Sequence, residues 1–360
     1  EQTMKKWLLA LCCVLVLGGC APRTKVIEDI QLIQAIGYDY VNKNEFRSVA
    51  SSLIVLPSEE TLPQTKVFTA TGNTSRITRK KMQTESSKYM VVGRIGLMLF
   101  QDRLAEDGIF YFLNVHQRDS MIGRNLRPAI VEGKTFDLLS KNYHLDTTVY
   151  QYLNELLEQS EREIYPRVTL HTALYQYYAE GTDMFLPIIK GNDDHARVTG
   201  LALFKEDRYI DKLNVHEASF FKLLSEPFRG GFYQVQISSD SFASLENVQA
   251  TPQYTITKDD NGLHVSILVY MKGVVSESGD LSMSAKDLTK IKELGIQQFE
   301  EQMQTLVNRF QQRGIDPIGL GDVASSKIRH LNMEQWHDTY PSLDIDVNVD
   351  LTVIGSGITD

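Results

Sequence analysis

The sequence predicts an α+β fold of several domains with mixed and antiparallel sheets, in which a C-terminal antiparallel sheet is packed by a long helix. Between Ser284 and Gly314, apolar residues mostly recur every three or four positions, which is typical of an amphipathic helix. In the closing segment, 343–354, apolar and polar residues alternate almost strictly, which is typical of a strand with one buried face. Two more strand patterns, 253–258 and 263–275, flank a polar turn and predict a hairpin.

Strand and helix patterns alternate in the first third of the chain. Two apolar runs, 32–41 and 46–56, are joined by a polar turn and predict a β-hairpin. They are followed by a short strand pattern at 66–71, a polar helical pattern at 74–87 and a strongly apolar strand pattern at 89–100. This order predicts a unit of strand, helix and strand.

The middle of the chain combines helical and strand patterns. Residues 109–116 are rich in aromatic side chains and fit either a helix or a strand. Pro166 separates two helical patterns, 147–160 and 168–179, which we expect to form a helical pair. We also expect a short helix around Trp336. The remaining strand patterns lie at 184–189, 197–204, 209–213 and 232–237.

The length of the chain suits two or three domains of ordinary size. We expect a signal peptide at residues 1–19 and a short tether at 20–24. An N-terminal α/β domain would follow at 25–122, a middle domain at 123–213, and the domain of sheet and long helix at 214–360.

The first twenty residues have the order of a bacterial export signal. An apolar run, Trp7–Leu17, has the length of a signal peptide core and falls short of the ~20 residues that a membrane-spanning helix needs. Leu17, Gly18 and Gly19 then precede Cys20, as in a lipobox, where the cysteine sulfur receives a diacylglyceryl group. We therefore expect a lipoprotein anchored through Cys20. An ordinary secretory signal with an incidental cysteine is the alternative.

Cysteine usage and charge limit the remaining chemistry. All three cysteines lie in the signal or at its end, so we expect no disulfide framework and no thiolate metal site in the mature chain. The net charge of −9 at pH 7 opposes broad binding to nucleic acid or to anionic lipid headgroups. Membrane residence is therefore expected to depend on the acyl chains at Cys20.

Catalytic motifs have no specific support in this sequence. Gly319–Ala324 fits G-x-G-x-x-A, but it follows a helix where a dinucleotide site needs a strand, so we expect a structural turn. His330 and His337 could share a helical face with Glu334 and form a zinc site. We favour the alternative that these histidines are solvated or lie at the edge of the core. Ser356 lacks the flanking residues of a nucleophile elbow. We expect no enzyme activity, cofactor or metal.

Two further polar or aromatic segments have ordinary structural interpretations. Asp193–His195 adjoins a glycine and is expected to be a loop. Tyr175–Tyr178 could line a ligand groove, but at helical spacing a domain interface or core edge is favoured.

Several segments, spread over the whole length, occur in an order and spacing that resemble a known family. They are the lipobox at Cys20, Ile30–Tyr40, Gly200–Lys205 with Tyr209, Asp316–Gly321, Trp336 and the closing strand Leu343–Gly357. Together they resemble the Ger(x)C family, the C-subunit lipoproteins of bacterial spore germinant receptors. One departure is Cys20-Ala21-Pro22, where members of the family commonly have Cys-Trp-Asp.

The resemblance implies a three-domain lipoprotein without known catalysis, on the outer face of the spore inner membrane. It would act in germination as one subunit of a nutrient-sensing receptor, together with membrane A and B subunits. The resemblance assigns no functional residue beyond Cys20 and leaves open whether this subunit binds a nutrient. A solute-binding lipoprotein of a membrane transporter is the alternative, although such proteins usually have two lobes of alternating strands and helices.

Overall fold

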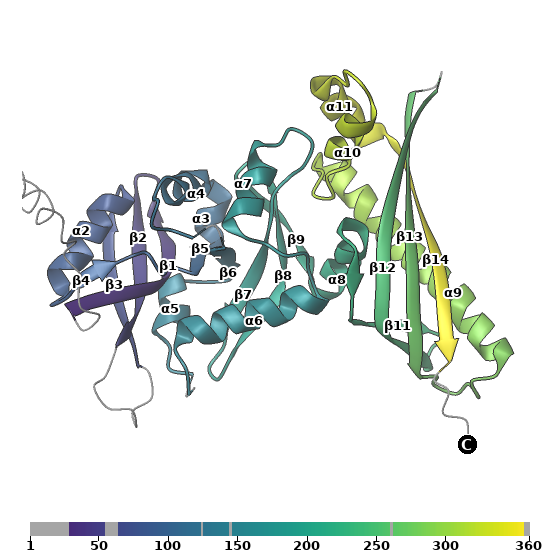
Figure 1. Ribbon diagram of the computed structural model, residues 1–360, viewed down its shortest axis with the longest axis horizontal. Coiled ribbons are helices and arrows are strands. Elements are labelled where there is room, and N and C mark those ends of the chain that lie inside the picture. Colours follow the sequence, from purple (N-terminus) through teal and green to yellow (C-terminus); the bar gives the residue numbers. More distant parts are fainter. Residues whose placement is uncertain (1–28, 55–63, 124, 144–145, 260–261, 356–360) are drawn as a thin grey trace, which may run out of the picture.

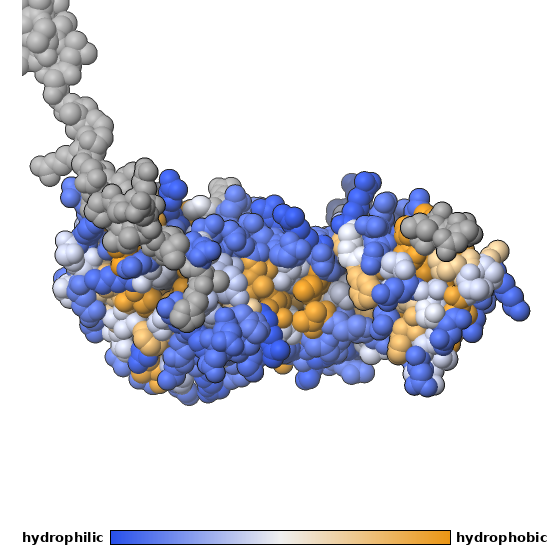
Figure 2. Space-filling view, turned by 90° about the horizontal axis from the view of Figure 1, so that it is seen from below, coloured by the Kyte–Doolittle hydropathy of each residue, from blue (hydrophilic) through white to orange (hydrophobic). Residues whose placement is uncertain are grey.

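The computed structural model describes residues 29–54, 64–123, 125–143, 146–259 and 262–355. They form two separate sheets in an elongated molecule, with the N-terminal sheet towards one end and the C-terminal sheet at the other (Figure 1). The face of the molecule shown in Figure 2 is largely hydrophilic, with separate apolar patches. This mixed arrangement of two sheets and covering helices confirms the predicted fold class.

A nine-stranded mixed sheet forms the first unit. Its strands are β1 (Ile30–Asn42), β2 (Glu45–Ile54), β3 (Gln64–Gly72), β4 (Tyr89–Val91), β5 (Leu97–Gln101), β6 (Arg127–Val131), β7 (Phe185–Gly191), β8 (Ala196–Lys205) and β9 (Arg208–Asn214). Their spatial order is β3-β2-β1-β5-β6-β7-β8-β9, and β4 pairs with the start of β1. The central pairs from β1 to β7 are parallel, and the pairs at both ends are antiparallel.

Helices cover both faces of this sheet. They are α2 (Ser75–Glu85), α3 (Asp102–Asp107), α4 (Phe110–Gln117), α5 (Thr135–Ser140), α6 (Val149–Glu163), α7 (Leu170–Tyr178) and α8 (Val215–Ser225). Because side chains alternate along a strand, Tyr38 on β1 contacts His116 of α4, while its neighbour Gly37 lies against Thr135 of α5. Figure 1 accordingly shows α4 and α5 on opposite sides of the sheet.

Most elements predicted for this region are confirmed. The hairpin predicted over 32–56 forms as β1–β2, and the helical pair forms as α6 and α7. The strand patterns at 197–204 and 209–213 form a second hairpin, β8–β9. The ambiguous segment 109–116 is helical, as α4. The strand expected over 89–100 is divided into β4 and β5, which pair with successive parts of β1, residues 30–32 and 35–38.

The first sheet is continuous across an expected domain boundary. Residues 25–122 and 123–213 were expected as separate units, yet β5 pairs directly with β6 from Leu97 opposite Arg127 onward. Both segments thus contribute strands to one sheet. The division of the chain into three domains remains a prediction.

The second unit is a five-stranded sheet packed by one long helix. Its strands are β10 (Phe228–Arg229), β11 (Phe232–Gln236), β12 (Phe242–Asp259), β13 (Gly262–Glu277) and β14 (Asp344–Gly355). Its helices are α9 (Ala285–Arg313), α10 (Leu320–Lys327), α11 (Met333–Thr339) and the 3₁₀ turn η2 (Tyr340–Ser342). Ser284 caps the start of α9, and Gly314 ends it in the left-handed conformation, so the helix has the bounds of the predicted amphipathic stretch.

One strand pair in this sheet corrects the sequence prediction. The hairpin β12–β13 is antiparallel as expected, although its turn residues 260–261 lie outside the described residues. However, β14 runs parallel to β13, with Asp344 opposite His264, so the C-terminal sheet is mixed. The long helix α9 between the two strands carries the chain back along the sheet, which is what a parallel pairing requires.

Two glutamine side chains of α9 form hydrogen bonds with the backbone of strands at the two edges of the C-terminal sheet. Gln298 both accepts from and donates to the backbone of Gln236 on β11. On β14, Gln304 accepts from Val347 and donates to Ile345 in the same way. Unpaired strand edges invite pairing with other chains, so these glutamines protect the edges of the sheet.

Candidate functional site

The predicted lipid-attachment site lies outside the part of the chain that the structure describes. Leu17, Gly18, Gly19 and Cys20 precede the first described residue, so anchoring through Cys20 remains a prediction. None of the helices in the described ranges is both long and apolar enough to cross a membrane.

The G-x-G-x-x-A segment begins at the end of the turn between α9 and α10: Gly319 is the N-cap of α10, and residues 320–324 lie in that helix. Gly319 has a φ of 83°, and its amide and that of Gly321 donate to the carboxylate of Asp316, at 2.9 and 2.8 Å. In a dinucleotide site, amides at such a turn would face the pyrophosphate. Here an acidic side chain of the same chain already occupies these donors.

This turn packs tightly against the loop that follows α7. A Cβ added to Gly321 would lie 2.7 Å from the Cα of Gly181 and 2.8 Å from Nε1 of Trp336. The amide of Asp322 donates to the carbonyl of Gly181 at 3.1 Å. The amide of Asp316 donates to the carboxylate of Asp183 at 2.6 Å. The first unit and the C-terminal unit therefore meet at this turn.

Two carboxylates are buried at the meeting point. Burial raises the pKa of Asp316 to about 7, against the opposing effect of its backbone donors, and the nearby Asp183 raises it further. Burial also raises the pKa of Asp183. The phenol of Tyr340 is buried nearby and has no hydrogen-bond partner in the described residues. This cluster joins two units.

The tyrosine-rich segment Tyr175–Tyr178 contacts both the C-terminal unit and a neighbouring helix of the first unit. Tyr175 donates to Asp322 on α10 at 2.6 Å. Tyr177 stacks on Phe110 of α4, with ring centroids 4.0 Å apart. The structure thus favours the interface interpretation of this segment over a ligand groove.

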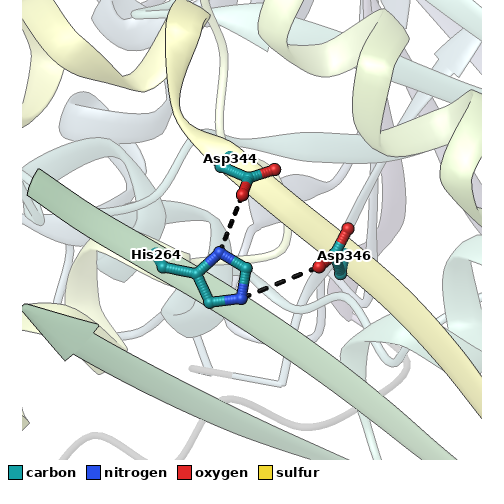
Figure 3. A group of neighbouring side chains, drawn as sticks. All are labelled: His264, Asp344 and Asp346. Carbon is teal, nitrogen blue, oxygen red and sulfur yellow. Dashed lines mark hydrogen bonds and ion pairs between the residues drawn. The ribbon is translucent and has the colours of Figure 1, made fainter. Parts of the chain in front are cut away.

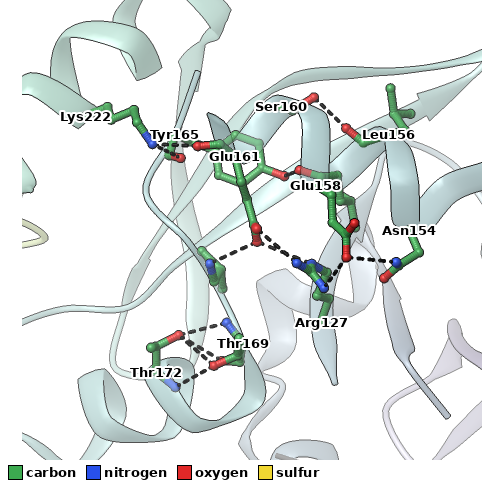
Figure 4. A network of polar contacts seen from close by, with 12 residues as sticks. Arg127, Asn154, Leu156, Glu158, Ser160, Glu161, Tyr165, Thr169, Thr172 and Lys222 are labelled. Carbon is green, nitrogen blue, oxygen red and sulfur yellow. Dashed lines mark hydrogen bonds and ion pairs between the residues drawn. The ribbon is translucent and has the colours of Figure 1, made fainter. Parts of the chain in front are cut away.

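A second polar network connects α8 to α6 (Figure 4). The side chain of Lys222 is almost fully buried, and it donates to the carbonyls of Glu161 and Tyr165 and to the carboxylate of Glu226. Arg127 on β6 forms ion pairs with Glu161, at 3.0 Å, and with Glu158, at 3.3 Å. A buried charge is costly unless it is paired and hydrogen-bonded, and here every named group is satisfied. The network holds elements together.

The histidines expected to be solvated are dispersed. His330 has a φ of 60° and lies before α11, so it does not share the face of that helix with Glu334 and His337. The zinc candidate is therefore wrong. Asp193–His195 lies in the loop between β7 and β8, as predicted, and Ser356 lies outside the described residues.

A different group of possible metal ligands lies on the exposed face of the C-terminal sheet (Figure 3). His264 Nδ1 is 3.0 Å from Asp344, and its Nε2 is 3.7 Å from Asp346. The two ring nitrogens point in different directions, so a single ion could use only one of them. The arrangement is that of a histidine bridging two surface carboxylates across β13 and β14.

A cavity of about 700 Å³ lies in the first unit, on the face of the sheet that α4 covers. It lies between α2, the end of α4 with the segment that follows it, and strands β1, β2 and β4. Its apolar lining consists of Ile33, Ile36, Ala50, Met82, Met90, Val92, Ile95, Val115, Met121 and Ile122. Cavities of this size hold small ligands in many proteins.

The buried polar pair of the cavity is neutral. His116 Nδ1 lies 2.8 Å from the carbonyl of Phe112, which can only accept, so Nδ1 carries the proton. Nε2 then accepts from the hydroxyl of Tyr38 at 3.2 Å. Burial lowers the pKa of His116 and raises that of Tyr38. Both groups are thus satisfied and uncharged at neutral pH.

Basic side chains line the mouth of the cavity. They are Arg76, Arg79, Lys80 and Arg118. Sequence reasoning identified the helix at 74–87 only as polar. The missed signal was its local charge, because α2 has four basic residues, one acid and no acid in its first turn.

The chain matches two family domains that together cover most of its length. They are the spore germination protein N-terminal domain, over residues 23–191, and the spore germination B3/GerAC-like C-terminal domain, over residues 199–357. The chain is 28% identical to the spore germination protein GerQC of Bacillus cereus, over 99% of this chain and 100% of that protein. It is 20% identical to the putative spore germination protein YfkR of Bacillus subtilis (strain 168), over 99% and 98%.

A solved structure has the same fold. The GerBC protein aligns with a TM-score of 0.60 over 89% of this chain and 96% of its own, at 14% sequence identity. At this identity the likeness concerns the fold, including the two sheets and the long helix on the second one.

Proposed function

Because the chain belongs to the GerAC-like family of spore germination proteins, the C subunits of germinant receptors, we propose that it is a non-enzymatic, lipid-anchored subunit of a nutrient-sensing receptor, acting with membrane A and B subunits. The main support for the proposal is the extent of the similarity to spore germination proteins. The matched domains include both sheets, and the similarity to GerQC covers 99% of this chain and 100% of that protein.

The geometry supports a role in assembly more than in chemistry. In the polar clusters described above, Asp316 accepts from two backbone amides and Lys222 donates to Tyr165 and Glu226, so both side chains join one element to another. In this proposal the protein lies on the outer face of the spore inner membrane, held through Cys20, and presents its two units to the membrane subunits.

Replacing the lipidated residue tests the proposal. In spores whose nutrient response depends on this receptor alone, Cys20→Ala should move the protein out of the membrane fraction, or leave it unprocessed, and abolish nutrient-triggered germination. Spore formation should stay normal. A matched substitution in the neighbouring tether, Ala21→Ser, should change neither property.

Two results would contradict the proposal. If the Cys20→Ala protein is processed at the same site and remains integral to the membrane, anchoring does not depend on this residue. If a strain lacking the protein keeps its full nutrient response with no second receptor present, the receptor assignment fails.

A further inference from the structure

The mouth of the cavity in the first unit has a strong local excess of positive charge. Arg76, Lys80 and Arg118 are exposed and form no ion pair with any described residue, and Arg79 is 4.0 Å from its one acidic neighbour, Asp119. The chain as a whole has a net charge of −9, so this cluster runs against the overall charge. Positive charge gathered around an opening attracts anions.

The position of these residues on α2 increases the effect. Arg76 lies in the first turn of the helix, where the partial positive charge of the helix N-terminus disfavours a cation. No acidic residue compensates it in that turn. A cation at this position costs stability, and an anion bound beside it would offset that cost.

Behind this basic mouth the cavity is apolar. Three methionines, Met82, Met90 and Met121, contribute to its lining, and Met121 is 56% exposed at the edge. Methionine side chains are flexible and adapt to apolar ligands of irregular shape. A molecule that fits both parts would have an anionic head and an apolar tail.

The start of the described chain lies beside the same cavity. Residue Ile30 at the start of β1 pairs with Tyr89 of β4, and Tyr89 and Met90 both line the cavity. The ten residues from Cys20 to Asp29 can span at most ~35 Å, at about 3.5 Å per residue. An anchor at Cys20 therefore keeps the cavity close to the membrane surface.

We propose that this cavity binds an anionic phospholipid of the membrane that holds the protein, with the phosphate at Arg76, Arg79 and Arg118 and one acyl chain against the methionines. The proposal rests on the proposed anchoring through Cys20, which brings the cavity to the membrane. Lipid binding would give the first unit a second point of contact with the membrane and so set its orientation there.

Vesicle binding of the full mature chain tests this directly. The chain is prepared as Cys20→Ala, so that no acyl anchor contributes, and is floated with vesicles of phosphatidylglycerol or of phosphatidylcholine. We expect binding to the first and none to the second. Combined replacement of Arg76, Arg79 and Arg118 by Gln should weaken binding on the order of 100-fold, because each basic residue near an anionic surface contributes several-fold.

A matched charge removal serves as the control. Lys286, Lys290 and Lys292 are exposed on α9 in the C-terminal unit, and their combined replacement by Gln removes the same charge without touching the cavity. This variant should bind phosphatidylglycerol vesicles within about twofold of the parent.

Soluble probes distinguish a lipid from a free anion. Monomeric dihexanoyl phosphatidylglycerol should bind one to one in calorimetry, and Met121→Asp, at an exposed position, should abolish that binding. Glycerol phosphate at the same concentration should not bind.

Four outcomes would overturn the proposal. They are equal binding to both kinds of vesicle, full binding after the three arginine replacements, equal loss in the lysine control, and binding of glycerol phosphate as tight as that of the lipid. Because this assay uses a chain without its anchor, its failure would leave the germination and fractionation results of the Cys20→Ala spores unaffected.

Discussion

Single residues show where the two units of the molecule depend on each other. Gly321 approaches the backbone of Gly181 so closely that no larger residue fits without movement. Asp316 closes the same turn by accepting from two of its amides. The G-x-G pattern is therefore explained by close packing and by internal hydrogen bonds.

Gly321→Ala should destabilise the protein by roughly 1–3 kcal/mol, because the new Cβ meets backbone atoms that cannot move aside cheaply. Gly123→Ala is the matched control, since a Cβ there has no neighbour within 4 Å. Urea unfolding of both variants measures the difference. Equal midpoints for the two would contradict the packing described here.

Asp316 should make stability depend on pH. Its pKa is about 7 in the folded protein and near 3.8 when unfolded, so the stability associated with this group is complete below about pH 4 and is lost as pH rises towards 7. Asp316→Asn cannot ionise, so its free energy of unfolding should fall less between pH 4 and pH 7.5 than that of the wild type. An unchanged slope in urea unfolding would show that the folded pKa is not raised.

At the scale of elements, periodicity predicted what was buried, but it could not specify strand direction. The alternation in 343–354 correctly placed Ile345, Val347, Val349 and Leu351 on the buried face. It did not show that β14 is parallel to β13, because the same alternation suits either direction. The division of the 89–100 strand was not predicted either, because it shows only in how β4 and β5 pair with different parts of β1.

Val349→Asp should unfold or deplete the C-terminal unit. Val349 is 7% exposed under α9, and an unpaired charge placed there costs ~3 kcal/mol or more. Asp350→Asn changes the neighbouring residue on the exposed face and should leave abundance and stability unchanged. Thermal unfolding and immunoblotting of spores compare the two, and equal behaviour would refute the assigned face of the strand.

At the scale of the whole molecule, net charge was a poor guide to local surfaces. The value of −9 led to the expectation that anionic headgroups would be repelled, yet basic side chains gather at one cavity mouth. The cavity itself could not be predicted, because its walls come from β1, α2, β4 and the segment after α4, which only the fold brings together. The buried Asp183 and Asp316 were missed for the same reason, since they are far apart in sequence.

The family resemblance, in contrast, could be found from the sequence. Its segments are distributed from the lipobox to the closing strand, and the matched domains cover 23–191 and 199–357. The described residues show why some of these segments are constrained. Asp316–Gly321 forms the turn where the units meet, and Trp336 packs against it.

The central claim, that this protein is the C subunit of a germinant receptor, is tested most directly by affinity capture of the tagged full-length protein from detergent-solubilised spore membranes. We expect co-purification of a multi-pass A subunit and a transporter-like B subunit, and loss of both when the bait carries Val349→Asp. Capture of an ATP-driven permease in place of these two subunits would refute the receptor assignment and favour a solute-binding lipoprotein of a transporter.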